Sequence, residues 1–489
     1  MRHRLGTLAV WGIVLTVAAA AGVYSLRNGR AALGLSLALL VISIVFADGG
    51  RGDFFGKYGW IPWAWIALAL TPDMHFTYRS PLDTSVTTTS AETFAQLIIY
   101  GLVAALVLSS RRLLVTGGPT HIRAGPLLLW PVLALASTVW SLVPLFTFVR
   151  ALQLLVPISL TLLMVRLWLS SPKVAAAVWR NTLRLFVRVV TALVLLGFAG
   201  GFWREPRFTW PGLQAGVASM YMGVGLLILI ACGRSFLGFR MPGYVARLSL
   251  FGVGLYFGDT RGVIAALLVG IAVWLWSTGR TKPLAKYVGI PYFAIGLALI
   301  LIAARPEILK YLARGETSQG IASLNGRIPL WWLSFDLLAN AGRWFTGFGY
   351  GAARVILPTH FAWAGTAHSS WVELLLAVGI LGPLLAAADI IYVSAYASSR
   401  RAVTSPSLTL SLLAFLMVVS ITSESLVFPG LGFVLLVLLH APVLAQRSAL
   451  VSSTGDHNAT DRSQPNSTGA ARNVASRKGL ARTHVVRQV

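Results

Sequence analysis

The chain has 489 residues, with 40 Lys and Arg against 15 Asp and Glu, so its formal net charge is +25. It is 56% hydrophobic and 11% charged, whereas a soluble globular chain is roughly 45–50% apolar and about 25% charged. This composition excludes a water-soluble enzyme. The basic residues are spread between apolar runs, unlike the dense patch of a nucleic-acid-binding protein. A single Cys232 excludes a disulfide framework and a cysteine-based metal site. We therefore predict an integral membrane protein with no nucleic-acid partner.

Fourteen apolar runs approach the length of about 20 residues that a helix needs to cross a bilayer. They are residues 8–26, 31–47, 59–71, 93–110, 126–142, 146–168, 175–202, 212–231, 245–257, 262–278, 288–304, 369–397, 407–424 and 430–446. The first run is followed at once by the second, which argues against a cleavable signal peptide. The third and ninth are short enough to be re-entrant, so we predict an all-α, polytopic fold with about 12–14 transmembrane helices.

The distribution of basic residues predicts the orientation, because cytoplasmic loops carry an excess of Lys and Arg. With the N-terminus inside, it and the inner loops hold seventeen Lys and Arg, whereas the short outer loops hold six. We therefore expect both termini in the cytoplasm. One larger extracytoplasmic loop, residues 305–368, is rich in Arg and Trp, and we expect it to form a lid. Residues 1–446 are the predicted membrane domain, and residues 447–489 are predicted to be a disordered basic tail that contacts membrane lipids.

Familiar motifs for phosphate or metal binding are missing from the sequence. GGRGDFFGKY is the nearest to a phosphate-binding loop, but its first glycine is displaced, and Tyr58 replaces the Ser or Thr that would bind magnesium. There is no HExxH motif and no closely spaced Asp pair. We therefore expect no metal and no cofactor, and we expect arginine to serve any chemistry on a phosphate-linked substrate.

Two arginines lie at predicted helix starts on the outer face. In GDTRG, Arg261 enters a helix from a hairpin, close to free backbone N–H groups and the positive end of a helix dipole. In SLNGRIPLW, Asn325 or Gly326 can cap a short helix that begins at Arg327. Guanidinium groups bind phosphate bidentately, so the two arginines are a candidate clamp for a pyrophosphate. The alternative for either is a loop arginine that contacts lipid headgroups.

The third candidate is His368, in the sequence AHSSWVELLLAVGILG. It lies at the mouth of a predicted helix, directly after the large outer loop. An imidazole titrates near neutral pH and can take a proton from an acceptor hydroxyl. Glu373 lies five residues on, too far around the helix to orient His368 directly. The alternative is an interfacial histidine whose polar atoms are satisfied locally.

Four further residues are candidates for substrate binding. Arg150 and Glu424 lie in predicted spans, where an ionisable group faces a cavity or a partner, and the two can instead form a structural pair with each other. Trp331 follows Arg327 on the same helix face. Tyr350 lies in the glycine-rich turn TGFGYG, which is weak evidence for nucleotide binding, and we expect its side chain to contact a sugar or a lipid.

From about residue 130 to residue 446, a series of motifs resembles the O-antigen ligase family of bacterial membrane glycosyltransferases. In chain order they are STVWSLVP followed by Arg150, then TWPGLQAG, GDTRG, NGRIPLW, TGFGYG, AHSSWVELLLAVGILG and SESLVFPG. Each motif in 130–446 is short, and their joint order on the predicted topology carries the resemblance. The resemblance implies a GT-C-like protein of the bacterial plasma (inner) membrane, with its active site on the extracytoplasmic face.

Proteins of this family transfer a glycan from an undecaprenyl-diphosphate carrier to a lipid, glycan or protein acceptor, without a metal. The resemblance implies that Arg261 and Arg327 hold the diphosphate and that His368 is the base for the acceptor hydroxyl. A single displacement would invert the anomeric centre. Two departures leave the acceptor open: Ser369 follows the histidine where the family often has Asn, and Gln214 lies where an Asn often begins a span.

Other functions remain open at this point. A glycan polymerase that acts on lipid-linked repeat units uses the same chemistry. A flippase or transporter would bind the lipid diphosphate only in transit, but it should show internal repeats and helices broken near the membrane midplane. A scaffold without activity gives no reason for Arg261, Arg327 and His368 to lie at the same face.

Overall fold

The computed structural model describes residues 58–73, 91–110, 125–199, 203–204, 207–210, 213–279, 323–398 and 406–461, together with the single residues 291 and 295. The spans predicted at 8–26 and 31–47 lie outside the described residues, as does nearly all of 288–304. So does the nearest approach to a phosphate-binding loop, apart from its last residue, Tyr58.

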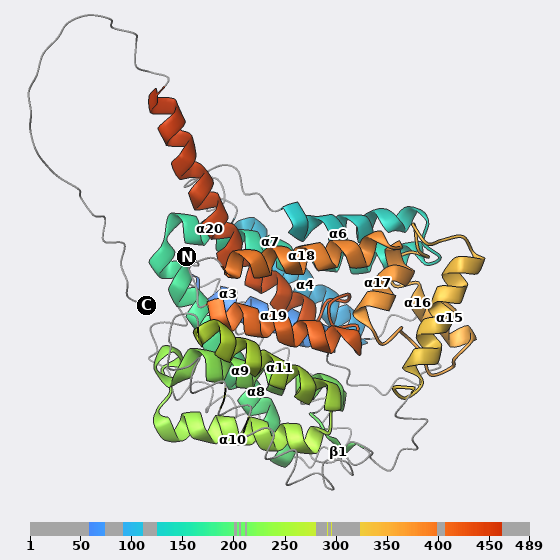
Figure 1. Cartoon of the computed structure of the whole chain (residues 1–489), viewed down its shortest axis with the longest axis horizontal. Coiled ribbons are helices and arrows are strands. Elements are labelled where there is room, and N and C mark those ends of the chain that lie inside the picture. The colour runs from blue at the N-terminus through green and yellow to red at the C-terminus, as the bar shows by residue number, and fades with distance from the viewer. Residues whose placement is uncertain are drawn as a thin grey trace, which may run out of the picture.

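The described part of the chain is built almost wholly of helices (Figure 1). The α-helices are α3 (Trp60–Asp73), α4 (Ala91–Ser109), α6 (Gly125–Ala136), α7 (Pro144–Ser170), α8 (Pro172–Ala199), α9 (Ala215–Leu237), α10 (Met241–Gly258), α11 (Arg261–Gly279), α15 (Arg327–Asn340), α16 (Ala353–Ile356), α17 (Ser370–Val378), α18 (Leu381–Ala397), α19 (Pro406–Ile421) and α20 (Leu431–Asp461). Two short 3₁₀ helices are η1 (Ser137–Val139) and η3 (Leu357–Thr359). Strands β1 (Trp203–Arg204) and β2 (Arg207–Phe208) pair antiparallel, with Trp203 opposite Phe208.

Five of these helices, α7, α8, α9, α11 and α20, are long and apolar enough to cross a membrane. Helices α4, α6, α18 and α19 are shorter and also apolar. A multi-pass helical membrane protein is therefore confirmed, and the predicted spans that fall on described residues coincide with helices. The number of spans, the side of the membrane and the GT-C-like arrangement stay predictions.

The span predicted at 369–397 is wrong as a single helix, because the structure divides it into α17 and α18. Gly379 ends α17 with φ 70° and ψ −165°, and its N–H donates to Leu375 O at 2.9 Å. The next N–H, of Ile380, donates to Trp344 O at 2.8 Å. Apolar residues continue on both sides of the break, so hydrophobicity alone does not reveal it.

The boundary predicted for the basic tail also needs correction. Helix α20 continues to Asp461, so the chain does not leave helical structure at residue 447. The sequence has no proline between Pro442 and Pro465, and proline is the residue that most strongly ends a helix. The tail beyond Asp461 lies outside the described residues.

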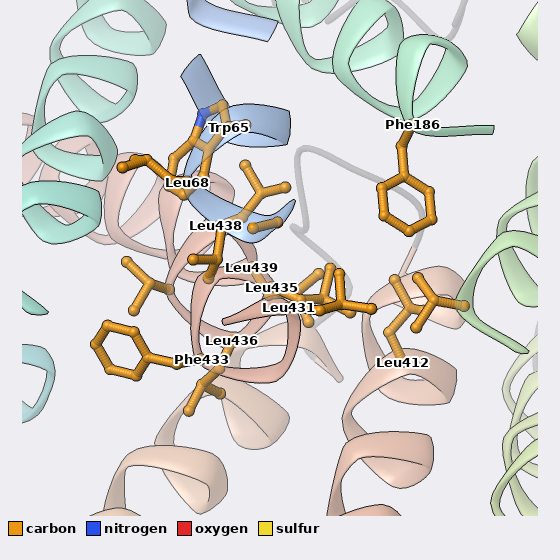
Figure 2. Packing of buried hydrophobic residues seen from close by; sticks show 14 of the residues in the cluster. Trp65, Leu68, Phe186, Leu412, Leu431, Phe433, Leu435, Leu436, Leu438 and Leu439 are labelled. Carbon is orange, nitrogen blue, oxygen red and sulfur yellow. The ribbon is translucent and has the colours of Figure 1, made fainter. Parts of the chain in front are cut away.

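Helix α20 forms the centre of the bundle. Its window Leu431–Ser448 is 94% buried, whereas the corresponding window of α11 is 17% buried. Figure 2 shows apolar side chains of α20 packed together with Trp65 of α3, Phe186 of α8 and Leu412 of α19. Because α20 is surrounded in this way, the loop that leads into its first turn is held in a fixed position.

A buried polar pair joins α20 to α18. His440 Nε2 lies 2.8 Å from Asp389 Oδ1, and the two side chains are 0% and 2% exposed. The other ring nitrogen, Nδ1, lies 2.9 Å from Leu436 O, and because a carbonyl only accepts, Nδ1 carries a hydrogen. The pair therefore shares its remaining proton between imidazole and carboxyl, which meets the need of buried ionisable groups for a partner.

The glycine-rich turn TGFGYG packs against the segment that joins α6 to α7. Phe348 N–H donates to Leu376 O at 2.7 Å, and Leu142 N–H donates to Phe348 O at 3.1 Å. Gly349 has φ 103°, and a Cβ there would collide with Ser141. Close packing of the backbone against Ser141 therefore explains why this turn contains glycine.

Replacing Gly349 by Ala should destabilise the protein by about 3 kcal/mol, because the new methyl group meets both left-handed strain and a steric clash. Gly342→Ala is the matched control, since Gly342 has φ 64° but no heavy atom within 4 Å of the place where its Cβ would lie. It should cost about 1 kcal/mol. Denaturation of the detergent-solubilised protein, followed by Trp fluorescence, measures both losses, and equal losses would contradict this account of the turn.

Candidate functional site

One end of the bundle gathers the residues that the sequence singled out. We call it the site end. Helices α3 and α19 finish there, and α4, α7, α9 and α20 begin there, because residues near these helix ends line one cavity, which is described below. Helices α15, α16 and α17 lie at this end, on the right of Figure 1. Their apolar residues form a separate cluster that includes Leu330, Ala353 and Leu375.

The peptide that precedes His368 is fixed from two sides. Trp331 Nε1 of α15 donates to Ala367 O at 2.9 Å, and Ala367 N–H donates to Glu373 Oε2 of α17 at 2.8 Å. His368 itself has φ 51°, a left-handed conformation that costs a non-glycine residue energy unless its surroundings hold it. Ser369 then occupies the N-cap position of α17 in an extended conformation, without a side-chain capping hydrogen bond. The backbone therefore presents the His368 ring in one direction.

The His368 ring lies between an aromatic side chain and a carboxylate. Trp363 stacks on it, with 5.7 Å between centroids and 14° between planes. His368 Nδ1 lies 3.7 Å from Glu424 Oε2, and the two side chains are 33% and 32% exposed. Burial raises the pKa of Glu424, but the contact with the His368 ring and its positive charge outweigh burial and lower this pKa to about 2. An imidazole with one nitrogen toward a carboxylate and one face open is suited to proton transfer.

The two predicted clamp arginines begin helices that contact the same region. Arg261 is the first residue of α11, and a Cβ on Gly262 would lie 3.0 Å from Thr422 Oγ1, two residues before Glu424. Arg327 is the first residue of α15, with Gly326 as its N-cap.

Two contacts connect these helix starts to His368. A Cβ on Gly326 would lie 3.3 Å from the Trp363 ring, which stacks on His368. Ser423 O accepts hydrogen bonds from both the backbone N–H and the hydroxyl of Ser370, at 2.9 and 2.7 Å. The loop between α19 and α20 thus links the start of α11 to the start of α17.

A polar cavity of about 160 Å³ adjoins the His368–Glu424 pair. Its lining comes from the ends of α3, α4, α7, α9 and α20, from α16, and from the loop before α20. The polar and charged side chains in the lining are Asp73, Thr93, Gln96, Arg150, Gln214, Arg354, Ser423, Glu424 and Ser425. His368, Arg261 and Arg327 are not among the described residues that line it. Glu424 is therefore the side chain that belongs to both the cavity and the histidine pair.

Arg150 and Arg354 are the two cations of this cavity. Arg150 Nη1 donates to Gln96 Oε1 at 3.0 Å and to Gln153 Oε1 at 3.1 Å. Arg354 lies over the Phe428 ring, 5.0 Å from its centroid. Arg150 thus contacts two amide side chains, while Glu424 lies next to His368, and a pairing of Arg150 with Glu424 stays a prediction.

One predicted site residue is a core residue instead. Tyr350 is 0% exposed, and its hydroxyl donates to Val427 O at 2.8 Å, so it does not reach a sugar or a lipid. Burial raises its pKa, and this hydroxyl is already satisfied by the protein. Trp331 acts on the backbone beside His368 through its indole N–H.

The sequence analysis did not single out Arg354 and did not predict the role of Glu373. Arg354 appeared only as one of several basic residues in a long loop, although it follows the glycine-rich turn within an apolar run, AARVIL, which is the signal that it is turned inward. The helix geometry predicted that Glu373 would not orient the His368 ring directly. Its carboxylate instead accepts the N–H of Ala367, the residue before His368. Its second oxygen, Oε1, is buried without a hydrogen-bond partner among the described residues.

Comparisons of the chain with protein-family models, with curated proteins and with solved structures found no match in any of the three. Within the described ranges, no group of three or more His, Cys, Asp and Glu side chains is arranged to hold a metal ion. The geometry of the site end is therefore what bears on function.

The lowered pKa of Glu424 makes part of the stability pH-dependent. Its ordinary value is 4.5 and its folded value is about 2, so the stabilisation is present above pH 4.5 and is lost as pH falls toward 2. The unfolding temperature of the wild type should therefore fall more steeply below pH 4.5 than that of Glu424→Gln.

Asp336→Asn provides the control, because Asp336 is an exposed carboxylate on α15. This variant should follow the wild-type pH dependence. If Glu424→Gln also follows it, the ion pair with His368 does not contribute to folding.

Proposed function

We propose that the protein is a membrane glycosyltransferase that moves a glycan from an undecaprenyl-diphosphate carrier to an acceptor hydroxyl on the extracytoplasmic face of the bacterial plasma membrane. The observation that carries the proposal is the His368–Glu424 pair at the end of the bundle to which the helix starts at Arg261 and Arg327 also belong. The order of motifs that resembles the O-antigen ligase family supports it further.

The reaction is a single displacement at the anomeric carbon. The acceptor oxygen attacks that carbon while His368 accepts the hydroxyl proton, and the bond between the anomeric carbon and the diphosphate oxygen breaks. Undecaprenyl diphosphate leaves with the bonding electrons, and in-line attack inverts the anomeric centre. Glu424 stabilises the imidazolium that forms, because its carboxylate faces Nδ1.

Arg261 and Arg327 are assigned to the departing diphosphate. Both are first residues of helices, where backbone N–H groups and the helix dipole favour an anion. Positive groups held in place before the reaction are worth most where charge develops in a poorly hydrated site. The negative charge that builds on the leaving group is the charge these arginines are positioned to offset.

A polymerase remains the second candidate, because it performs the same displacement with another lipid-linked repeat unit as acceptor. A flippase is disfavoured by the arrangement of the candidate residues, which lie at one end of the bundle. In secondary transporters, substrate sites lie near the midplane at broken helices. The predicted span 369–397 is broken at Gly379, but this break lies next to the site end, unlike the midplane breaks of transporters.

A deletion strain complemented with His368→Ala or Arg261→Ala tests the proposal. Each variant should lower transfer by about 100-fold or more, since a general base and an electrostatic clamp each contribute at least that much. Lipid-linked glycan should accumulate with unchanged chain length, measured by mass spectrometry of extracted lipids, while finished glycan disappears.

Arg343→Ala is the matched control, because Arg343 lies over the Phe348 ring and belongs neither to the His368–Glu424 pair nor to the cavity lining. It should complement at equal expression. Accumulated single repeat units in the His368 variant would indicate a polymerase. Full complementation by both His368→Ala and Arg261→Ala would refute the transferase.

A further inference from the structure

The polar cavity beside the histidine pair is separate from the predicted diphosphate clamp. Its described lining includes Arg150, Arg354 and Glu424, but neither Arg261 nor Arg327. It opens beside Glu424, whose other neighbour is the proposed base, His368. A group bound in this cavity would therefore be separated from the proposed base by the Glu424 side chain alone.

One hydrogen-bond donor of Arg354 has no partner among the described residues. Its Nε is buried and has no hydrogen-bond partner among the described residues, and the Ser425 hydroxyl beside it in the lining is in the same state. A buried donor without a partner costs free energy, so a ligand that supplies an acceptor is favoured. The Phe428 and Phe146 rings, 5.0 and 5.9 Å from the guanidinium carbon, hold the Arg354 side chain in place.

The carboxylates of the lining are already engaged. Asp73 Oδ2 accepts hydrogen bonds from the Tyr221 hydroxyl at 2.9 Å and from Leu431 N–H at 3.1 Å. Glu424 faces His368. The two arginines are joined by the N-terminal ends of α4, α9 and α20, each of which contributes residues to the lining and carries the positive end of a helix dipole. Asp73 and Glu424 keep their negative charges, so the lining holds two arginines and two carboxylates, and the three helix N-termini add positive potential.

We propose that this cavity is the acceptor subsite and that Arg354 selects an acceptor sugar that carries an oxyanion, either a phosphate or a carboxylate. Guanidinium groups bind both oxyanions bidentately. Gln96 and Gln214 in the lining offer amide groups for sugar hydroxyls, and the Phe428 ring offers an apolar surface. Naming the cavity an acceptor subsite rests on the proposed transfer reaction, whereas the selection of an oxyanion rests on the cavity alone.

Binding of monosaccharides to the purified full-length chain in neutral detergent tests the selection. The probes are glucose 6-phosphate and glucuronate, with glucose as the uncharged control, and the readout is the ligand-dependent rise in unfolding temperature. The wild type should bind at least one anion about 10-fold more tightly than glucose, and the stronger anion identifies phosphate or carboxylate as the preferred group. Equal affinity for all three sugars, or no binding at millimolar concentrations, would overturn the proposal.

Arg354→Gln should reduce the preference for the anion to about 1, while Arg343→Gln keeps the wild-type value. Arg354→Lys, which keeps the charge but loses bidentate geometry, should give an intermediate preference and covers the case in which the glutamine variant does not fold. An unchanged preference in both Arg354 variants would refute the assignment of this residue.

The result of the binding measurement can be separated from the result for the proposed function, because the binding measurement contains no lipid-linked glycan. Transfer by the wild type without any anion preference would sustain the transferase and refute the acceptor subsite. An Arg354-dependent anion preference in a protein that transfers no glycan would sustain the oxyanion cavity and refute the transferase.

Discussion

Where a chain leaves a helix near a membrane, its backbone N–H and C=O groups lose their helical partners and have little water to bind. The protein itself must therefore supply their hydrogen-bond partners. This constraint governs the site end of the bundle. Ser370 binds Ser423 O twice, Asp73 accepts the N–H of Leu431 at the start of α20, and both polar groups of Ala367 are bound by side chains. Each of these contacts joins different segments of the chain, most of them far apart in the sequence. The loops at this end therefore behave as one packed layer.

The same contacts position His368 and Glu424. His368 takes a left-handed conformation because the peptide before it is fixed by Trp331 and Glu373. Glu424 reaches His368 because the loop that carries it is held by Ser370 and by the buried start of α20. A general base on a loop is effective only when that loop is held within a narrow range of positions. In the proposed mechanism, the hydrogen bonds that hold these loops also position the base.

Hydrophobic runs predicted the helices well, since nearly every apolar run on the described residues became a helix. They missed the break at Gly379 because apolar residues continue across it, and the signal was only a glycine in AVGILG. Motif order brought attention to His368 and Glu424 but did not predict that they pair. Tyr350 was assigned wrongly because a tyrosine in a glycine-rich turn reads the same whether it faces a ligand or the core. Arg354 was overlooked because three-dimensional packing, not spacing, turns it inward.

The distribution of arginine separates two roles for positive charge in this chain. A protein with 40 Lys and Arg against 15 Asp and Glu has many cations that need only contact lipid headgroups. Those at the site end differ, because Arg150 and Arg354 line a cavity, and Arg261 and Arg327 begin helices beside it. Arg150 and Arg354 share the cavity lining with Glu424. Arg261 and Arg327 belong to helices whose first residues approach Thr422 and Trp363. The proposed transfer from a diphosphate donor to an oxyanion-bearing acceptor would use both cationic positions, with His368 and Glu424 as the proton acceptor.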